Sequence, residues 1–315
     1  MAMSQLQEQG YVVVKSALPQ SLLAELREVI EQSPIGVASI SDEHRYNDRY
    51  QGDHLYIGFS DADMQRVGAT RHDVYARLVS SRGIIEALEG AGLRSVKYWA
   101  GSVMSKPPGG PPLYWHHDWA FFDHPLSQQP AGHQIFAMIY LRDTSPANGC
   151  LRVIPGSHLT RLPLHDELAR LMAEGEGPAH GGWGQSSPWE SRGKASALFC
   201  DPPGAVDVCV HAGDCVIGDS RLLHATHPNS SADRRTGLTL WYIAGWDDLS
   251  PPFQKYWAQS AKPSYQNRPV SLEAWNLMED LVPPLPDPAT QAQKGMVDWQ
   301  GGGPRATPPP STARL

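Results

Sequence analysis

The chain has 315 residues, a formal net charge of −7 and a pI near 6.0. This length allows one large domain with a substantial core, and the acidic balance argues against nucleic acid as the main partner because no basic cluster could collect phosphates. The longest apolar stretch, residues 135–141, is far too short to span a bilayer.

Targeting and cysteine usage are consistent with a cytoplasmic protein. The first ten residues carry no apolar run, so we expect no secretory signal. The four cysteines, Cys150, Cys200, Cys209 and Cys215, contain no Cys-x-x-Cys pair, which favours reduced thiols. We expect all four to be buried as small apolar side chains. The expected partner is a small molecule rather than a nucleic acid or a membrane, and a homodimer remains open.

The first third of the chain predicts helices with little strand. Residues 10–15 are typical of a short strand, and residues 20–32 repeat apolar side chains at helical spacing. Residues 36–75 are polar and are expected to be irregular. A second helix is predicted over residues 83–91.

From Val96 onward, short apolar runs alternate with Gly, Pro and Asn-Gly turns, which is typical of strands. The expected strands are Val96–Ser105, Leu113–Ala120, Gln134–Leu141, Cys150–Ile154, Ala205–His211, Asp214–Gly218, Arg221–Thr226 and Gly237–Ala244. Many short strands with turns predict a mainly β sandwich or barrel, with the early helices covering one outer face.

A long insertion interrupts this β region over residues 162–206. It begins with a predicted helix at residues 164–174 and continues as a segment rich in Gly, Ser, Pro and Trp, which is typical of a functional loop. Trp183 and Trp189 would either form an aromatic lid or anchor a surface loop. A further helix is expected after Pro252. Residues 1–282 would form one domain, followed by a Pro- and Gly-rich tail over residues 283–315.

The segment Leu113-Tyr-Trp-His-His-Asp-Trp-Ala120 contains a candidate pair of metal ligands. In a strand, His116 and Asp118 point the same way while His117 points oppositely. Together with a distant histidine they would occupy one face of an octahedral metal, as in non-haem Fe(II) oxygenases. Because the chain has 13 histidines and 33 acidic residues, about one such His-x-acid pair is expected by chance.

A competing pair, His165-x-Glu167, is rejected on geometric grounds. It lies in a segment with helical periodicity, where residues two apart lie about 200° apart around the axis and cannot chelate one ion. The first pair follows Pro111-Pro112, which excludes a helix there.

The third ligand is expected to be His224. Its rivals are His158, His211 and His227; His211 falls in a turn and His227 directly precedes a proline. His224 instead lies on a segment that reads as a core strand.

Arg235 completes the constellation. A ferrous oxygenase of this kind needs a two-electron co-substrate, and 2-oxoglutarate chelates iron through its keto and carboxylate oxygens. Its far carboxylate then needs a planar, permanently charged partner, which a guanidinium supplies. Thr226 lies two residues after His224, on the same face, and could donate its hydroxyl to that carboxylate. On the predicted strand after residue 233, Arg234 would point away.

These residues resemble the phytanoyl-CoA dioxygenase family of Fe(II)/2-oxoglutarate-dependent oxygenases. The matching segments are Lys106-Pro-Pro-Gly109, Trp115-His-His-Asp118, Asn148-Gly-Cys-Leu151, Pro155-Gly-Ser-His158, Ala212-Gly-Asp214, Arg221-Leu-Leu-His224, Pro228-Asn229, Ser231 and Arg234-Arg235, within residues 8–245.

The resemblance implies a double-stranded β-helix (jelly-roll) core with Fe(II) near one open end, and with 2-oxoglutarate and O2 as co-substrates. It implies His116, Asp118 and His224 as iron ligands and Arg235 as the clamp for 2-oxoglutarate, with Thr226 beside it. It also implies that Ser102 and Met138 line the co-substrate pocket. Related halogenases lack the carboxylate ligand, so the presence of Asp118 indicates oxidation of a C–H bond, such as hydroxylation, rather than chlorination.

Substrate contacts are predicted from strand phase. Gln134, Phe136 and Tyr140 share a face with Met138, which makes them candidates for substrate contacts unless they are ordinary core residues. The lack of a basic patch disfavours a CoA thioester, so we expect a small metabolite or natural-product intermediate. The alternatives are a zinc hydrolase that uses the same ligands and a non-catalytic jelly-roll binding protein.

Overall fold

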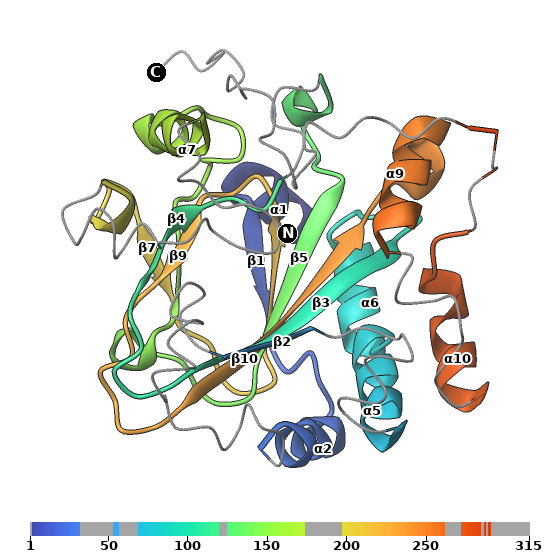
Figure 1. Cartoon of the computed structure of the whole chain (residues 1–315), viewed down its shortest axis with the longest axis horizontal. Coiled ribbons are helices and arrows are strands. Elements are labelled where there is room, and N and C mark those ends of the chain that lie inside the picture. Colours follow the sequence, from blue (N-terminus) through green and yellow to red (C-terminus); the bar gives the residue numbers. More distant parts are fainter. Residues whose placement is uncertain are drawn as a thin grey trace.

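Two antiparallel sheets form the centre of the protein (Figure 1). The computed structural model describes residues 2–31, 53–56, 69–119, 125–173, 197–261, 272–284, 287 and 289–290. The larger sheet contains, in spatial order, β1 (Tyr11–Val14), β8 (Cys215–Asp219), β5 (Gln134–Tyr140), β10 (Arg235–Ile243), β3 (Lys97–Lys106) and β2 (Asp53–Tyr56). The smaller sheet contains β4 (Leu113–His116), β9 (His224–Thr226), β6 (Leu151–Val153) and β7 (Val206–Val208).

Strand β5 shows why the larger sheet carries an apolar layer on each face. All of its side chains are buried. Ile135, Ala137 and Ile139 pack into the core on the helix side, while Phe136 and Met138 pack into a second cluster between the two sheets. Because side chains alternate along a strand, a strand covered on both faces becomes apolar throughout. The jelly-roll fold predicted from the sequence is confirmed.

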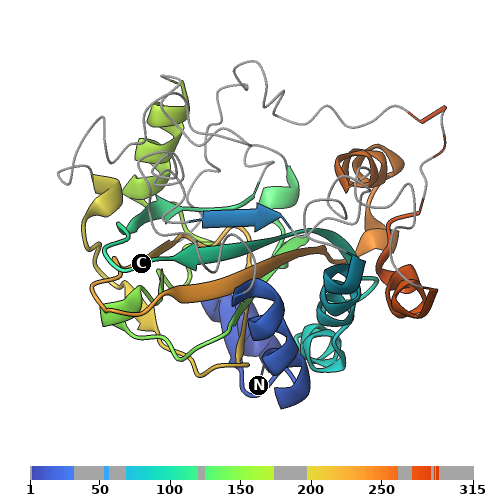
Figure 2. The same ribbon diagram turned by 60° about the horizontal axis from the view of Figure 1, so that its bottom comes forward.

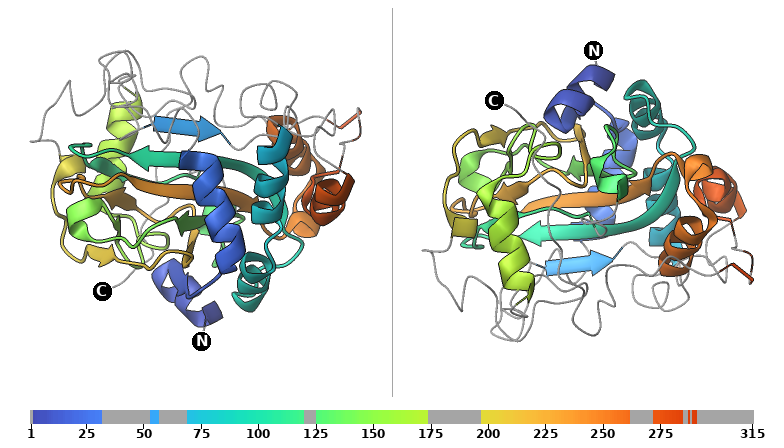
Figure 3. Two further views of the ribbon diagram at one scale, coloured as in Figure 1. Left: turned by 90° about the horizontal axis from the view of Figure 1, so that it is seen from below. Right: turned by 90° about the horizontal axis from the view of Figure 1, so that it is seen from above.

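Helices cover the outer face of the larger sheet. These are α1 (Ala2–Gln9), α2 (Gln20–Glu31), α5 (Ala69–Val79) and α6 (Arg82–Gly90). Figure 3 shows α2 lying across the strands, where Leu23 and Leu26 join the helix-side core. This is the outer layer expected from the sequence.

Three further helices lie elsewhere. Helices α9 (Pro251–Ala261) and α10 (Leu272–Met278) follow β10, and α10 packs against α5. Helix α7 (Pro163–Ala173) packs beside β4 of the smaller sheet, on the opposite side of the β core from α1 and α2 (Figure 2). The predicted helix over residues 164–174 is therefore present. Residues 174–196 of the insertion, which include Trp183 and Trp189, and most of the tail lie outside the described residues.

Some predicted boundaries were wrong. Strand β4 ends at His116 instead of Ala120, because the backbone N–H groups of Asp118 and Trp119 both donate to the carbonyl of Ser220, at 2.8 and 3.0 Å, and leave the ladder. The region 36–75, expected to be irregular, contains β2 and the start of α5.

The expected burial of all four cysteines was also wrong. Cys150 and Cys215 are buried, but Cys200 and Cys209 are exposed. Within the described part of the chain, no helix combines the length and apolar character needed to cross a membrane.

Candidate metal centre

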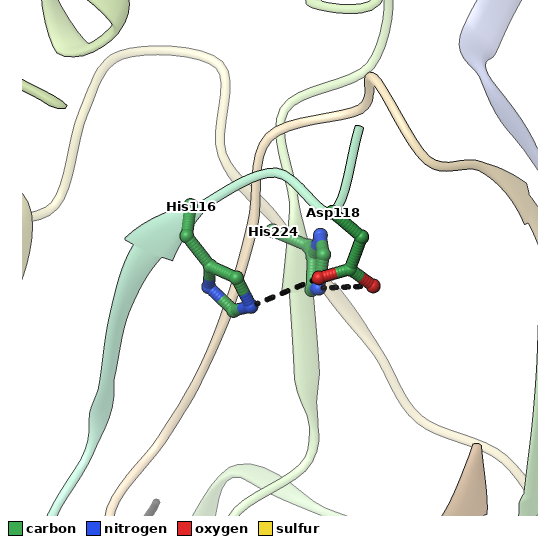
Figure 4. A group of neighbouring side chains, drawn as sticks. All are labelled: His116, Asp118 and His224. Atoms are coloured by element: carbon green, nitrogen blue, oxygen red, sulfur yellow. Dashed lines mark ion pairs between the residues drawn. The ribbon is translucent and has the colours of Figure 1, made fainter. Parts of the chain in front are cut away.

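Three side chains converge between the ends of β4 and β9 (Figure 4). His116 and His224 are paired residues of these adjacent strands, and Asp118 follows two residues after β4. The Nε2 atom of His116 lies 3.6 Å from Oδ1 of Asp118, and Nε2 of His224 lies 3.9 Å from Oδ2. Ligand atoms that each lie about 2 Å from one ion are at most about 4 Å apart. The arrangement therefore fits a single metal ion.

Backbone carbonyls fix both imidazoles in the tautomer that ligation requires. Nδ1 of His116 lies 2.9 Å from the carbonyl of Tyr114, and Nδ1 of His224 lies 3.0 Å from that of Leu222. Since a carbonyl only accepts, each Nδ1 carries a proton, which leaves Nε2 as the nitrogen that can bind a metal. Burial, reinforced by the neighbouring His224, lowers the pKa of His116 to about 4. His116 is therefore neutral at physiological pH, the form that binds a metal.

Asp118 is held from three directions. Its Oδ2 accepts a hydrogen bond of 2.8 Å from the indole of Trp241, and its carbonyl accepts one of 3.1 Å from the amide of Gln134. Its own N–H donates to Ser220. Strand phase predicted the convergence of His116 and Asp118, but the Trp241 contact was missed. Its one signal in the sequence is that Trp241 shares a strand face with Arg235.

A buried ion pair in turn holds Ser220. Arg221 donates to both carboxylate oxygens of Asp219, at 2.9 and 2.6 Å, and to the carbonyls of Ser127 and Gln129. Both side chains of the pair are nearly inaccessible. This bidentate geometry with additional backbone partners is the arrangement that makes a buried pair rigid. The loop that receives Asp118 is thus fixed independently of any metal.

A cavity of about 60 Å³ opens beside the three converging side chains. At roughly 10–15 Å³ per water molecule, it has room for a small organic acid. It is lined by Met104, Lys106, Leu113, His116, Asp118, Met138, Tyr140, Leu151, His224, Thr226, Arg235, Thr239 and Trp241.

Two buried cations, Arg235 and Lys106, form one part of the cavity wall. Within the described residues neither forms an ion pair with a carboxylate, and Nε of Arg235 has no hydrogen-bond partner. Lys106 donates to the hydroxyl of Thr226 at 2.7 Å and to the carbonyls of Pro111 and His227. Burial, followed by the charge of Arg235, lowers the pKa of Lys106 well below its usual value. Buried charge without a counterion is costly, so this wall fits an anionic group of a ligand.

Comparison with known proteins supports the same assignment. The family model of phytanoyl-CoA dioxygenase matches residues 6–237. The chain belongs to the phytanoyl-CoA dioxygenase family.

Two relatives are described as dioxygenases. A Stutzerimonas stutzeri protein described as a probable alpha-ketoglutarate-dependent hypophosphite dioxygenase is 26% identical over 254 residues, covering 75% of this chain and 76% of the relative. The ectoine dioxygenase of Nocardia farcinica is 27% identical over 160 residues, covering 50% of this chain and 49% of the relative. A solved structure of HygX from Streptomyces hygroscopicus, with nickel and 2-oxoglutarate bound, is 17% identical, with a TM-score of 0.50 and coverage of 76% of this chain and 85% of that one. That likeness shows the fold alone.

The family member described here is therefore an Fe(II)- and 2-oxoglutarate-dependent dioxygenase. The donor set fits the metal, because two imidazoles and one carboxylate on one side leave the other positions open. The uncompensated Arg235 and Lys106 fit the distal carboxylate of the co-substrate.

Most residues predicted for the site lie together. His116, Asp118, His224, Thr226, Met138, Tyr140 and Arg235 all line the cavity. Arg234 points away and donates to the carbonyl of Ser105 at 3.3 Å, as expected from strand phase.

Three predicted residues lie outside the cavity lining. Ser102 is buried on β3. The Gln134 amide contacts the backbone of Asp118, and the ring of Phe136 packs 5.3 Å from that of His224. Gln134 and Phe136 thus support ligating residues from behind. Lys106, quoted within a motif but given no role, was the cavity cation that the sequence reasoning missed.

The rejected histidines have other partners. The Nδ1 atom of His165 accepts the N–H of Leu162 at 2.9 Å, and Glu167 pairs with Arg170 on the same helix. His211 contacts Asp143, at 3.0 Å. The geometric rejection of the pair at residues 165 and 167 is consistent with these contacts.

Proposed function

We propose that this dioxygenase oxidises a C–H bond of a small metabolite or natural-product intermediate, with hydroxylation as the outcome and with release of succinate and CO2. The observation that carries the proposal is a single cavity that joins His116, Asp118 and His224 to the uncompensated cations. The cavity has a mixed wall in which Met104, Leu113 and Trp241 supply apolar surface.

In this proposal His116, Asp118 and His224 ligate Fe(II), and Arg235 binds the distal carboxylate of 2-oxoglutarate. When bound, iron would activate O2, which supplies the oxidising equivalents, and 2-oxoglutarate would supply two of the four electrons that O2 takes up. The protein holds the ligand geometry, excludes water and positions one C–H bond. Because Asp118 is held by Trp241, the coordination position it takes is closed to a halide, which supports hydroxylation over chlorination.

The pocket for the co-substrate would be closed by Lys106 and Thr226. Lys106 donates to the Thr226 hydroxyl at 2.7 Å, so the two side chains would contact the carboxylate together. Met138 would pack on the carbon chain of the co-substrate, and Ser102 would contribute from β3. The Arg235 guanidinium lies 5.6 Å from the centre of the Tyr140 ring, a distance at which a cation–π contact keeps it in place.

Substrate would approach past the aromatic residues near Asp118. The ring of Trp241 packs against that of Trp99, with centroids 6.5 Å apart, and Trp99 packs against Trp257 at 4.9 Å. Such a wall suits an apolar or partly apolar molecule. Of the three predicted substrate contacts, Tyr140 lines the cavity; Gln134 and Phe136 would act through the residues they support.

The test is succinate release by the Fe(II)-loaded protein with 2-oxoglutarate and a panel of small metabolites. The panel should include hypophosphite and ectoine, the compounds named for the two relatives. Substrate-dependent succinate with an oxygenated product of a carbon compound supports the proposal. Turnover of hypophosphite alone would replace the C–H bond by a P–H bond as the target.

The two alternatives have their own readouts. Ester hydrolysis that depends on zinc and not on 2-oxoglutarate would favour the hydrolase. Failure to bind Fe(II) and 2-oxoglutarate anaerobically would favour a non-catalytic binding protein. Both alternatives leave the paired cations Arg235 and Lys106 unexplained.

A further inference from the structure

A second group of metal-binding side chains lies on the smaller sheet, away from the iron-binding side chains. The backbone N–H of His227 donates to the carbonyl of Cys150 at 3.2 Å. The pairing of β6 with β9 aligns Leu151 with Thr226, so one step further aligns Cys150 with His227. The pairing of β6 with β7 aligns residue 151 with Val208, which places Cys209 opposite Cys150.

Strand phase therefore brings three donors to one row of the sheet. Directly opposed residues of antiparallel strands point to the same face. Leu151 and Thr226, which line the cavity, are on the other face. Cys150, Cys209 and His227 thus share the face away from the cavity, and Asp207 joins them from two residues before Cys209.

Distances agree with this phase argument. Donor atoms of Cys150, Asp207 and His227 lie within 4.8 Å of one another, and Nε2 of His227 is 2.8 Å from Oδ1 of Asp207. Zinc bonds of about 2.0 Å to nitrogen or oxygen and about 2.3 Å to sulfur bring donors within roughly 4 Å of each other. Cys150, Asp207 and His227 are therefore close enough to bind one ion, and Cys209 lies opposite Cys150 across the sheet.

The two thiols of the cluster differ in their access to solvent. Cys209 is exposed and Cys150 is buried, so a cation could reach the cluster from solvent on the side of Cys209.

We propose that Cys150, Cys209, Asp207 and His227 form a binding site for a thiophilic divalent cation, with Zn²⁺ as its natural occupant. Two thiolates, an imidazole and a carboxylate match the four-coordinate preference of zinc. Two thiolates and a carboxylate carry three negative charges. The dication offsets two of them, and the guanidinium of Arg152, which lies 3.3 Å from Asp207 and also pairs with Asp201, offsets part of the third.

The ion would join three strands at one end of the smaller sheet. His227 directly follows β9, which carries His224 and Thr226. The carbonyl of His227 accepts a hydrogen bond of 2.6 Å from Lys106. Zinc at His227 would therefore stabilise the strand that supports both the iron-binding side chains and the closed end of the cavity.

Cobalt(II) distinguishes this site from the iron centre. A thiolate bound to cobalt gives an intense near-ultraviolet charge-transfer band, and His116, Asp118 and His224 include no thiolate. The full chain, stripped of metal and kept reduced with a phosphine, should bind two equivalents of cobalt and show this band. Added Zn²⁺ should remove the band.

Variants show which of the two sites binds each equivalent of cobalt. The double variant Cys150→Ser/Cys209→Ser, which removes both thiolates, should bind one equivalent and lose the band. His116→Ala should also bind one equivalent but keep the band, and Cys200→Ser, which alters another exposed cysteine, should behave as the unmodified chain. Circular dichroism checks that each variant is folded.

Three results would overturn the proposal. They are a single cobalt equivalent with no thiolate band in the unmodified chain, a band that persists in Cys150→Ser/Cys209→Ser, and a mass two hydrogens lower under non-reducing conditions with Cys150 and Cys209 linked. The last would identify the pair as a disulfide. None of these readouts uses turnover, so they are independent of the proposed reaction.

Discussion

The indole N–H of Trp241 donates a hydrogen bond of 2.8 Å to Oδ2 of Asp118. Trp241 lies on β10 of the larger sheet, whereas Asp118 follows β4 of the smaller one. The bond therefore ties the two sheets together at the carboxylate that would ligate iron. It also limits rotation of that carboxylate, whose Oδ1 faces His116 (Figure 4).

Replacing Trp241 with Phe should weaken Fe(II) binding by about 10–100-fold, because partners of ligating side chains contribute that much to metal affinity. An aromatic ring is kept, whereas the N–H and the second ring of the indole are lost. The measurement is anaerobic Fe(II) titration. Trp99→Phe, which trims the neighbouring ring without touching Asp118, is the matched control; equal weakening in both variants would assign the effect to packing.

Replacing Arg235 with Met should weaken 2-oxoglutarate binding by about 10–150-fold, the range expected for hydrogen bonds to a charged group. Arg235→Lys should recover only part of the loss, because an ammonium cannot form the bidentate contact. The dissociation constant is measured anaerobically with Fe(II) present. Arg234→Met should bind nearly as the unmodified chain does, since Arg234 points to Ser105. The reverse pattern would place the clamp at residue 234.

His116→Ala should abolish succinate formation, while His117→Ala should retain much of it. Nε2 of His116 faces Asp118, whereas the ring of His117 lies on the side of His165, with centroids 6.0 Å apart. Succinate is measured at saturating Fe(II) and 2-oxoglutarate. Equal losses would mean that both histidines act at the iron.

Breaking the Asp219–Arg221 pair should destabilise the protein. Arg221→Met leaves the Asp219 carboxylate buried without its partner, for which a loss of about 3–5 kcal/mol in the free energy of unfolding is expected. Chemical denaturation measures it. Arg170→Met, which removes an arginine from a more exposed pair, should cost less than about 1 kcal/mol. Similar losses would show that the buried pair adds nothing to stability.

Stability should also fall in mild acid through His165. Burial lowers its pKa to about 4, and its Nδ1 accepts an N–H, which requires the neutral ring. The unfolded chain takes up this proton near pH 6.5, so the stabilisation is present above about pH 6.5 and is lost as the pH falls toward 4. Between pH 6.5 and 5 the loss is at most about 2 kcal/mol.

His165→Asn is the test variant because it keeps an acceptor and removes the titration. Its free energy of unfolding should depend less on pH over this range than that of the unmodified, metal-free chain. Parallel curves would mean that His165 does not contribute.

The sequence predicted those parts of the fold that follow from periodicity. The alternation on β5 and β10 placed Met138, Tyr140 and Arg235 on one face correctly, because a strand with two covered faces has no other register. The pairing of His116 with a distant His224 also followed from motif and strand phase together.

What the sequence did not predict depends on contacts between distant segments. The capture of Asp118 by the carbonyl of Ser220 involves a backbone group, which every residue possesses. Lys106 gave no sign of burial, because a lysine beside two prolines is ordinarily exposed; its place follows from acceptors at Thr226 and His227. The exposure of Cys209 likewise depends on which face of β7 meets solvent.

Lys106 and Arg235 are held in place by the backbone and by Tyr140, so the closed end of the cavity stands at a fixed separation from His116, Asp118 and His224. With one carboxylate bound by these cations and the 2-oxo acid group bound to iron, the fixed separation would select the length of the carbon chain between them. A dicarboxylic 2-oxo acid one methylene shorter would not reach the cations with its distal carboxylate. An acid one methylene longer would have to bind in a bent conformation. Selectivity for the five-carbon acid would then arise from length, with no residue devoted to recognising the middle of the molecule.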